Sequence, residues 1–294
     1  MNILLSGATG FIGQQVLLQD KANCIHRCVV RVLNKNNAPC ETFVIEDINN
    51  NTSWTNAFNN IDAVIHLAGI AHNKSDNLDV IFETNTLGTL KLARDAVANG
   101  VTRFIFVSTA SIYENKSVFS AQTKSKYDAE VGLKKIAEET GLEVVIVRPT
   151  LVYGSNAPGN FGALTRLVNK VSVLPFGLVN NKRDFISVQN LADLLITCAS
   201  DPKAAGHTFL ASDGKAVSIK DFTDAIAKGL NKRLIQLPIP VWLMRLAGKL
   251  LGKSVMVEQL VGNLEVDSSN AQEVLGWVPP YTMQQAMHLL LENN

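Results

Sequence analysis

The stretch that decides the fold is Ile3-Leu4-Leu5-Ser6-Gly7-Ala8-Thr9-Gly10-Phe11-Ile12-Gly13, at the start of a chain of 294 residues. An apolar run typical of a buried strand leads into Gly7, and helical spacing begins at Phe11. Gly7, Gly10 and Gly13 therefore occupy the turn from strand to helix. The first glycine permits the tight turn, the second lets a ligand approach the backbone, and the third lets the helix pack on the strand. The free amides at the start of the helix are then placed to bind the linked phosphates of a dinucleotide.

More short apolar runs follow this first strand up to about residue 150. Each is apolar nearly throughout rather than at alternate positions, which is typical of strands covered on both faces. The expected strands are Ile3–Ser6, Cys28–Leu33, Thr42–Ile45, Ala63–Leu67, Arg103–Ser108 and Glu143–Val147. The expected helices between them are Phe11–Gln19, Asp79–Ala98 and Thr123–Glu139. This alternation predicts an α/β protein with a Rossmann-type, doubly wound parallel sheet.

The pattern becomes less regular after Pro149, where glycine and proline are frequent before an apolar run at Leu191–Ala199. We therefore expect a dinucleotide-binding domain over residues 1–154, with residues 178–200 returning to it. Residues 155–294 are expected to form a smaller, irregular substrate-binding lobe. No low-complexity linker separates the two, so we expect a shared interface that holds a ligand.

Charge and composition exclude several classes of protein. The net charge is +1 with no block of like charges, which argues against nucleic-acid binding. Apolar residues make up 47% of the chain, enough for a sizeable core. The first residues lack the basic segment and cleavage site of a signal peptide, and no apolar run is long enough to span a bilayer. We expect a soluble, cytoplasmic protein.

The cysteines show no metal-binding pattern. They form no CxxC pair and no cluster with histidine, so no metal site is expected. All four are expected to be plain packing residues, as in a reduced cytoplasmic protein. They are Cys24, Cys28, Cys40 and Cys198.

The end of the second predicted strand bears on the choice between NAD and NADP. A carboxylate about 20 residues beyond the turn would bind the ribose 2′-hydroxyl of NAD, whereas an arginine accommodates the 2′-phosphate of NADP. The chain has Val30-Arg31-Val32-Leu33-Asn34 there, followed by Lys35, and no carboxylate. Arg31, with Lys35 beside it, favours NADP. NAD stays open, because an arginine at a strand end can simply be solvated.

Further motifs follow the turn in order along the chain. They are Glu46-Asp47, Ile65–Gly69, Thr84–Thr89, Phe106–Tyr113, Ser125–Glu130, Arg148–Gly154, Gly159–Phe161, Lys182–Val188 and Leu275–Trp277. Together with the turn at Gly7, they resemble the extended short-chain dehydrogenase/reductase family, in its branch of nucleotide-sugar epimerases and reductases. The resemblance covers nearly the whole chain. It is closest to bacterial enzymes that reduce or epimerise C4 of UDP-linked N-acetylated deoxy sugars for surface polysaccharide.

The resemblance implies a role for each matching residue. Thr109 would hydrogen-bond the reacting sugar oxygen, and Lys126 would hold the ribose hydroxyls and lower the pKa of a partner tyrosine. The residues implied at the cofactor are Gly7, Thr9, Gly10, Phe11, Ile12, Gly13, Arg31, Asp47, Ile48, Leu67, Ala68, Gly69, Asn85 and Lys126. Those implied at the substrate are Thr109, Ser111, Tyr113, Asn160 and Arg183, the last two at the diphosphate.

The chain departs from the family at the acid–base residue, a tyrosine four positions before the lysine and on the same helical face. The matching position holds Gln122, and no tyrosine in the chain is followed four residues later by a lysine. An amide forms hydrogen bonds but does not titrate in water. Losing general acid–base catalysis costs a factor of about 10²–10⁴. Gln122 therefore predicts impaired activity unless Tyr113 or a water substitutes. Tyr127 cannot take this role, because it lies about 100° around the helix from Lys126.

A basic stripe lies near the C-terminus, over residues 241–253. Arg245, Lys249 and Lys253 are spaced four apart, opposite leucine and tryptophan. Such a helix can rest on an anionic membrane surface. An amphipathic lid helix of the substrate lobe is the alternative, and it is the one that we favour.

Three functions fit these observations. The leading one is an NAD(P)-dependent 4-epimerase or 4-keto reductase of a nucleotide sugar, most simply UDP-linked, with Thr109, Lys126 and Gln122 at the reacting centre. The second is a catalytically silent, cofactor-binding protein that regulates or assembles others, which Gln122 favours. The third is the reduction of a small ketone or aldehyde unrelated to sugars. Pairing of two copies through the long Rossmann helices is also left open.

Overall fold

A seven-stranded parallel sheet forms the first of two units in the computed structural model, which describes residues 1–32, 40–71, 77–113 and 119–292. The strand order is β10-β6-β5-β4-β1-β2-β3, and every neighbouring pair is parallel. The strands are β1 (Ile3–Ser6), β2 (Ile25–Val30), β3 (Glu41–Val44), β4 (Ala63–His66), β5 (Arg103–Val107), β6 (Glu143–Pro149) and β10 (Thr208–Ala211). The order reverses between β1 and β4, where such sheets bind their ligands. The predicted Rossmann-type sheet is confirmed.

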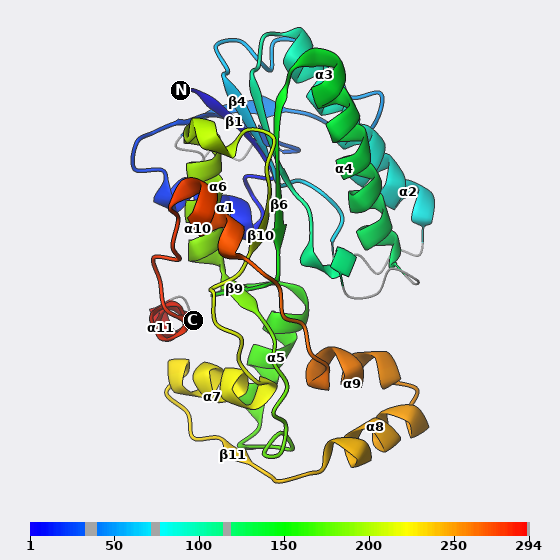
Figure 1. The fold of residues 1–294 in the computed structure, drawn as a ribbon, viewed down its shortest axis with the longest axis vertical. Helices are drawn as coiled ribbons and strands as arrows, with labels where there is room; N and C mark the ends of the chain where they lie inside the picture. Colours follow the sequence, from blue (N-terminus) through cyan, green and yellow to red (C-terminus); the bar gives the residue numbers. More distant parts are fainter. Residues whose placement is uncertain (33–39, 72–76, 114–118, 293–294) are drawn as a thin grey trace. The chain divides into compact units, whose positions relative to one another are not determined.

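Helices cover both faces of this sheet (Figure 1). One face carries α1 (Phe11–Gln19), α6 (Val188–Ser200) and α10 (Ser269–Leu275); the other carries α2 (Leu78–Phe82), α3 (Thr89–Ala98) and α4 (Ala121–Thr140). Short helical turns lie at η2 (Ala110–Tyr113) and η3 (Pro202–Ala204). The inner strands β1, β4 and β5 are buried on both faces, because successive side chains alternate between the two helical layers, whereas the edge strand β3 is partly exposed. Leu4, Val64 and Phe104, for example, pack with Leu92 of α3 and Leu133 of α4.

The predicted helix Asp79–Ala98 contains a π-helical segment, η1 (Glu83–Gly88), between α2 and α3. Such segments are frequent at functional sites. Within it, the Thr86 hydroxyl donates to the Ser125 carbonyl over 2.8 Å, so side chains as well as the helical ladder hold η1. Gly88 allows a close approach, since a Cβ there would lie 2.6 Å from Ile48 Cγ2.

The returning segment of the chain differs from the expected residues 178–200. The first unit comprises residues 1–150, 191–211 and 268–278, and the second comprises 151–190, 212–267 and 279–294. Residues 178–190 belong to the second unit because β9 (Phe185–Ser187) pairs with β7 (Leu151–Tyr153) there. The chain returns through α6 and then adds β10 to the edge of the sheet, beside β6. That strand was not predicted.

The expectation that all four cysteines are plain packing residues is wrong for two of them. Cys28 and Cys40 form a disulfide with a Cα–Cα distance of 6.4 Å, whereas Cys24 and Cys198 are free. The parallel register sets Cys28 of β2 opposite Thr42 of β3, so Cys40, two residues earlier, lies within reach. The second predicted strand also begins earlier than expected, at Ile25.

The second unit is smaller and less regular. Its elements are β7, α5 (Gly159–Lys170), β8 (Val173–Leu174), β9, α7 (Ile219–Gly229), β11 (Ile235–Gln236), α8 (Val241–Leu250), α9 (Ser254–Val261) and α11 (Met283–Glu292). Aromatic side chains form its core, where the Phe185 and Phe222 rings stack at 3.8 Å. The Tyr153 ring meets Phe222 edge-on at 5.5 Å.

The basic stripe of residues 241–253 is not one helix, contrary to our expectation. Helix α8 ends at Leu250, and the Lys253 amide donates back to the Gly248 carbonyl over 2.7 Å. Gly252 has a φ of +66°, a conformation that glycine adopts readily and that ends helices. Lys253 therefore precedes α9 instead of continuing the face of Arg245 and Lys249.

Candidate active site

The glycine turn has the close packing that its sequence predicts. Gly7 has a φ of +75°, and a Cβ there would lie 2.8 Å from the Ala68 nitrogen. A Cβ on Gly13 would meet the Gly7 carbonyl oxygen and lie 2.8 Å from Ala8 Cα. Helix α1 follows with Gly10 as its N-cap and no side chain capping it. The amides of its first turn are thus open to an anion.

A cavity of about 560 Å³ lies beside this turn, at the carboxyl ends of β1 to β4. Nine of the residues predicted at the cofactor line it: Gly7, Thr9, Gly10, Arg31, Asp47, Ile48, Leu67, Ala68 and Gly69. Phe11, Ile12, Gly13, Asn85 and Lys126 do not, and Lys35 lies outside the described residues. The lining that sequence reasoning missed is Val29, Val30, Ile45, Ile70, Ala71, Val80 and Thr84. The size and the mixed polar and apolar lining fit the adenosine part of a dinucleotide.

Asn85 fastens the loop that follows β4. Its Nδ2 donates to the Ile70 carbonyl over 3.1 Å, and its Oδ1 accepts from the Ile70 amide at 2.7 Å. Nδ2 also donates to Ser125 Oγ of α4 over 3.0 Å. Asn85 therefore fixes the wall of the cavity through the backbone of Ile70.

A buried hydrogen-bond chain runs behind the same loop. His66 Nδ1 lies 2.6 Å from Ser6 Oγ, and His66 Nε2 lies 2.9 Å from Thr89 Oγ1. The Thr89 hydroxyl donates its proton to the Asn85 carbonyl over 2.8 Å, so Nε2 must be the donor to Thr89. Nδ1 then accepts from Ser6, whose oxygen accepts from the Ala68 amide at 3.4 Å. His66 is thus neutral, because burial, aided by the charge of Lys126, lowers its pKa from 6.5 to about 3.

This histidine makes stability depend on pH. The folded pKa is below the unfolded one, so the unfolded state binds more protons as the pH falls from about 6.5 towards 3. The contribution of His66 to the free energy of unfolding is fully present above pH 6.5. It is lost as the pH falls, by up to about 1.4 kcal/mol per pH unit. Urea unfolding at pH 7, 5.5 and 4.5 should show a shallower decline for His66→Gln than for the wild type. Parallel curves would show that His66 does not titrate on unfolding.

Lys126 is anchored at the end of the neighbouring strand, β5. Its Nζ donates to the carbonyls of Val107 and Ser108 over 3.1 and 3.2 Å. Burial lowers its pKa from 10.5 to about 8, with the Glu130 carboxylate opposing the shift. The Ser108 hydroxyl beside it is buried and has no hydrogen-bond partner among the described residues. Sequence reasoning missed this serine, whose position at a strand end was the available signal.

Thr109 and Ser111 lie just after β5, where the Ser111 amide donates to Thr109 Oγ1 over 3.2 Å. Tyr113 ends the η2 turn, and its hydroxyl accepts from Arg148 Nη1 at 2.5 Å. Glu130 of α4 holds Arg148 from the other side, with Arg148 Nε donating to Glu130 Oε1 over 2.9 Å and Nη2 donating to Oε2. The Glu130 hydrogen bonds raise the pKa of Arg148, despite its partial burial. The Tyr113 hydroxyl thus contacts the buried Arg148–Glu130 ion pair.

Gln122 lies in the first turn of α4, one turn before Lys126, where its carbonyl accepts from Ser125 Oγ at 3.0 Å. None of the four tyrosines of the chain lies one turn before Lys126. The Tyr127 ring packs at 5.9 Å from Phe119. Tyr153 is buried in the second unit and donates to Asp213 Oδ2 over 2.6 Å, and burial raises the pKa of its hydroxyl.

The two diphosphate candidates lie in the second unit. Asn160 is exposed in the first turn of α5. Arg183 is buried, and its Nη1 donates to the Gly262 carbonyl over 3.0 Å.

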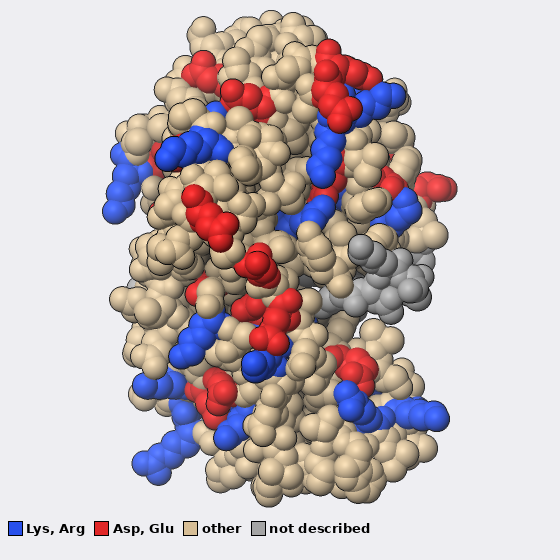
Figure 2. Space-filling model, viewed as in Figure 1, with Lys and Arg blue, Asp and Glu red and all other residues tan. Residues whose placement is uncertain are grey.

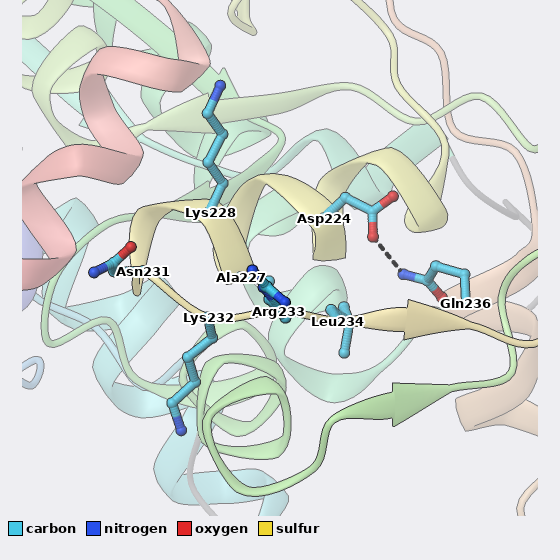
Figure 3. A pocket seen from close by; sticks show the side chains of 8 residues that line it. All are labelled: Asp224, Ala227, Lys228, Asn231, Lys232, Arg233, Leu234 and Gln236. Atoms are coloured by element: carbon cyan, nitrogen blue, oxygen red, sulfur yellow. Dashed lines mark hydrogen bonds between the residues drawn. The ribbon is translucent and has the colours of Figure 1, made fainter.

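A second cavity, of about 430 Å³, lies between α7 and β11 in the same unit. Its Lys228 and Lys232 side chains extend in opposite directions, while Gln236 Nε2 donates to Asp224 Oδ1 over 2.8 Å (Figure 3). Lys228 and Lys232 therefore do not converge on one point in this cavity.

Fold and site together define a Rossmann-type protein with a cavity beside its glycine turn. The model of the NAD dependent epimerase/dehydratase family matches residues 3–211, about seven tenths of the chain. The chain belongs to this family.

Two characterised relatives match along nearly their whole length. A UDP-glucose 4-epimerase of Vibrio cholerae is 40% identical over 305 residues, which cover 97% of this chain and 92% of that protein. An N-acetyl-alpha-D-glucosaminyl-diphospho-ditrans,octacis-undecaprenol 4-epimerase of Escherichia coli O157:H7 is 24% identical, covering 99% and 94%. The family resemblance inferred from the motifs is confirmed.

Solved structures confirm the fold. The UDP-N-acetylglucosamine 4-epimerase of Bacillus cereus superimposes with a TM-score of 0.78 at 20% identity and 99% coverage of both chains.

Proposed function

We propose that this protein interconverts the C4 epimers of a UDP-linked sugar, using a bound nicotinamide dinucleotide. The observation that carries the proposal is the joint presence of the glycine-turn cavity and the Lys126 anchor at the carboxyl edge of one sheet. The 40% identity to a UDP-glucose 4-epimerase along nearly the whole chain supports C4 as the reacting carbon. A 4-keto reductase would use the same residues and differs in consuming its cofactor.

Each part of the site has a separate role in this proposal. The bound cofactor supplies a hydride acceptor and donor at its nicotinamide ring. The open amides of α1 would hold its phosphates, and Lys126 would donate to its ribose hydroxyls. Thr109 hydrogen-bonds the oxygen on the reacting sugar carbon. From the family resemblance, Asn160 and Arg183 would contact the diphosphate of the substrate.

Gln122 limits the rate in this account. Its amide can orient the sugar oxygen but cannot exchange a proton with it at neutral pH. Proton transfer then depends on water, and turnover is slow. A catalytically silent, cofactor-binding protein is the second candidate, and it is favoured by the same observation that no tyrosine lies one turn before Lys126.

Arg31 favours NADP over NAD. It lines the cavity at the end of β2, where the adenosine ribose of a Rossmann-bound dinucleotide lies. A guanidinium pairs well with a phosphate. We therefore propose tighter binding of NADPH than of NADH.

Product analysis tests the proposal. UDP-glucose and UDP-N-acetylglucosamine are each incubated with the protein and NAD⁺ or NADP⁺, and the sugars are then separated by chromatography. We expect a C4 epimer without net change in absorbance near 340 nm, because an epimerase regenerates its cofactor. An unchanged sugar with saturating cofactor would favour the silent protein, and stoichiometric oxidation of a reduced cofactor with a 4-keto sugar would favour the reductase.

The charge of Lys126 should make cofactor affinity depend on pH. Since its pKa is about 8, the ammonium that donates to the ribose is lost above that pH. We expect the Kd for NADPH to rise roughly tenfold between pH 7 and pH 9.5, because a hydrogen bond loses its charged partner. Lys126→Arg, which keeps its charge, should give a flat profile in a fluorescence titration. An unchanged pH dependence in Lys126→Met would assign the effect to another group.

A further inference from the structure

The helical hairpin α8–α9 of the second unit exposes large apolar side chains. They are Trp242 (63% exposed), Leu246 (47%), Leu250 (79%), Leu251 (70%), Val255 (74%) and Met256 (50%). Gly248 is the one buried residue of α8. Scattered surface leucines are ordinary, but a contiguous set of this kind marks an interaction surface.

The hairpin is nevertheless a defined structure. A Cβ on Gly248 would lie 2.6 Å from Val257 Cγ2, so the two helices approach closely there. Arg245 Nε donates to Glu258 Oε1 over 2.6 Å and joins them on the outside. The exposed apolar side chains are therefore held in place while facing solvent.

We call the exposed side chains of Trp242, Leu246, Leu250, Leu251 and Val255 the apolar strip. Trp242, Leu246 and Leu250 are spaced four apart and lie on the same face of α8. Leu251 and Val255 continue the apolar strip in sequence, in the turn after α8 and in the first turn of α9.

Positive charge borders this strip. Residues 241–257 contain Arg245, Lys249 and Lys253 and no acidic residue. Arg245 is paired with Glu258, whereas no ion pair involves Lys249 or Lys253 within the described ranges. In Figure 2 the part of the surface where Figure 1 labels α8 is mainly uncharged, with blue side chains beside it.

Exposed apolar side chains together with lysines fit a lipid surface better than an interface with another protein. The core of a protein interface is depleted in lysine, and a symmetric pairing of two copies would bring the like charges together. A lipid surface instead takes apolar side chains below the headgroups and lysines at the phosphates. Tryptophan is enriched at that boundary. No helix in the described part of the chain is long and apolar enough to cross a bilayer, so the contact would be a surface one.

We propose that the α8–α9 hairpin binds the surface of an anionic phospholipid bilayer. The apolar strip enters the boundary between headgroups and acyl chains, and Lys249 and Lys253 lie against lipid phosphates. This binding depends neither on the cofactor nor on the sugar reaction, so it stands apart from the proposed function.

Vesicle sedimentation tests this directly. The full chain is mixed with vesicles of phosphatidylcholine alone, or of equal parts phosphatidylcholine and phosphatidylglycerol. We expect binding to the mixed vesicles to be stronger by at least tenfold, and to weaken with added salt. Lys249→Gln/Lys253→Gln should lower that affinity by roughly 30-fold, since each lysine near such a surface contributes about fivefold. Leu250→Ser/Leu251→Ser should abolish it.

Leu18→Ser is the matched control, because Leu18 is 78% exposed on α1, in the other unit. It should bind like the wild type. Failure to sediment with either vesicle, or equal binding to both vesicle types, would overturn the proposal. So would a dimer that the Leu250→Ser/Leu251→Ser change converts to a monomer without any vesicle binding, since the strip would then be an interface between two copies.

Discussion

Replacing Gln122 with tyrosine is expected to raise kcat for C4 epimerisation by roughly 10²-fold, the lower end of the usual contribution of general acid–base catalysis. Gln122 lies one turn before Lys126 on α4, so a phenol there would share a helical face with the ammonium. A nearby cation favours the phenolate, which accepts a proton from the sugar hydroxyl. An amide cannot do so. The gain is measured as initial rates of epimer formation at saturating cofactor.

Gln122→Phe is the matched control, because it adds the ring without the hydroxyl. We expect its rate to stay at or below that of the wild type, and its cofactor affinity to stay near that of Gln122→Tyr. If the two variants turn over equally slowly while binding cofactor, the position does not serve acid–base chemistry in this chain. The silent protein would then be the better description.

Glu130→Gln is expected to lower the free energy of unfolding by about 3–5 kcal/mol, because it leaves the Arg148 charge without its partner. The Glu130 side chain is 2% exposed and that of Arg148 is 11% exposed, so solvent screens the pair little. The neutral amide still accepts one hydrogen bond but no longer balances the guanidinium. Urea unfolding at pH 7 measures the loss.

The Arg245–Glu258 pair provides the comparison, since its side chains are 54% and 52% exposed. Glu258→Gln should cost less than about 1 kcal/mol, as exposed ion pairs do. Replacing both buried partners, as in Glu130→Leu/Arg148→Met, should restore much of the stability. If Glu130→Gln and Glu258→Gln lowered the free energy of unfolding equally, Glu130→Gln would not be leaving the Arg148 charge buried and unpaired.

The sheet could be predicted because its inner strands are buried on both faces. Runs such as Arg103–Ser108 are apolar nearly throughout, and glycines mark the helix ends, as at Gly141 with its φ of +77°. Strand β10 was missed because Thr208–Ala211 is short and polar at its start, and its place depends on pairing with β6. The Cys28–Cys40 disulfide was missed for a similar reason, since only the β2–β3 register brings the two cysteines together.

The cofactor turn was predictable because its requirements are local. A Cβ at Gly7 would clash with the backbone of the loop after β4, and a Cβ at Gly13 would clash with the backbone of Gly7 and Ala8. Both positions therefore require glycine. The His66 chain and the Glu130–Arg148 pair were not predictable, because each joins elements distant in sequence. The structural role of Asn85 was not predictable either, because it depends on a hydrogen bond to Ile70 in the loop after β4. The sequence had predicted Asn85 only as a cofactor residue.

Binding of a nicotinamide dinucleotide to the glycine-turn cavity is the claim on which the other functional proposals depend, the lipid contact excepted. It is tested by titrating the protein with NADPH and NADH and following nicotinamide fluorescence, with Gly13→Val in parallel. A valine there would meet the backbone of Gly7 and Ala8 and displace the start of α1. We predict saturable binding by the wild type, tighter for NADPH, and none by a Gly13→Val variant whose circular dichroism shows it folded. A wild-type protein that binds neither dinucleotide, or a folded Gly13→Val variant that binds both unchanged, would contradict the account.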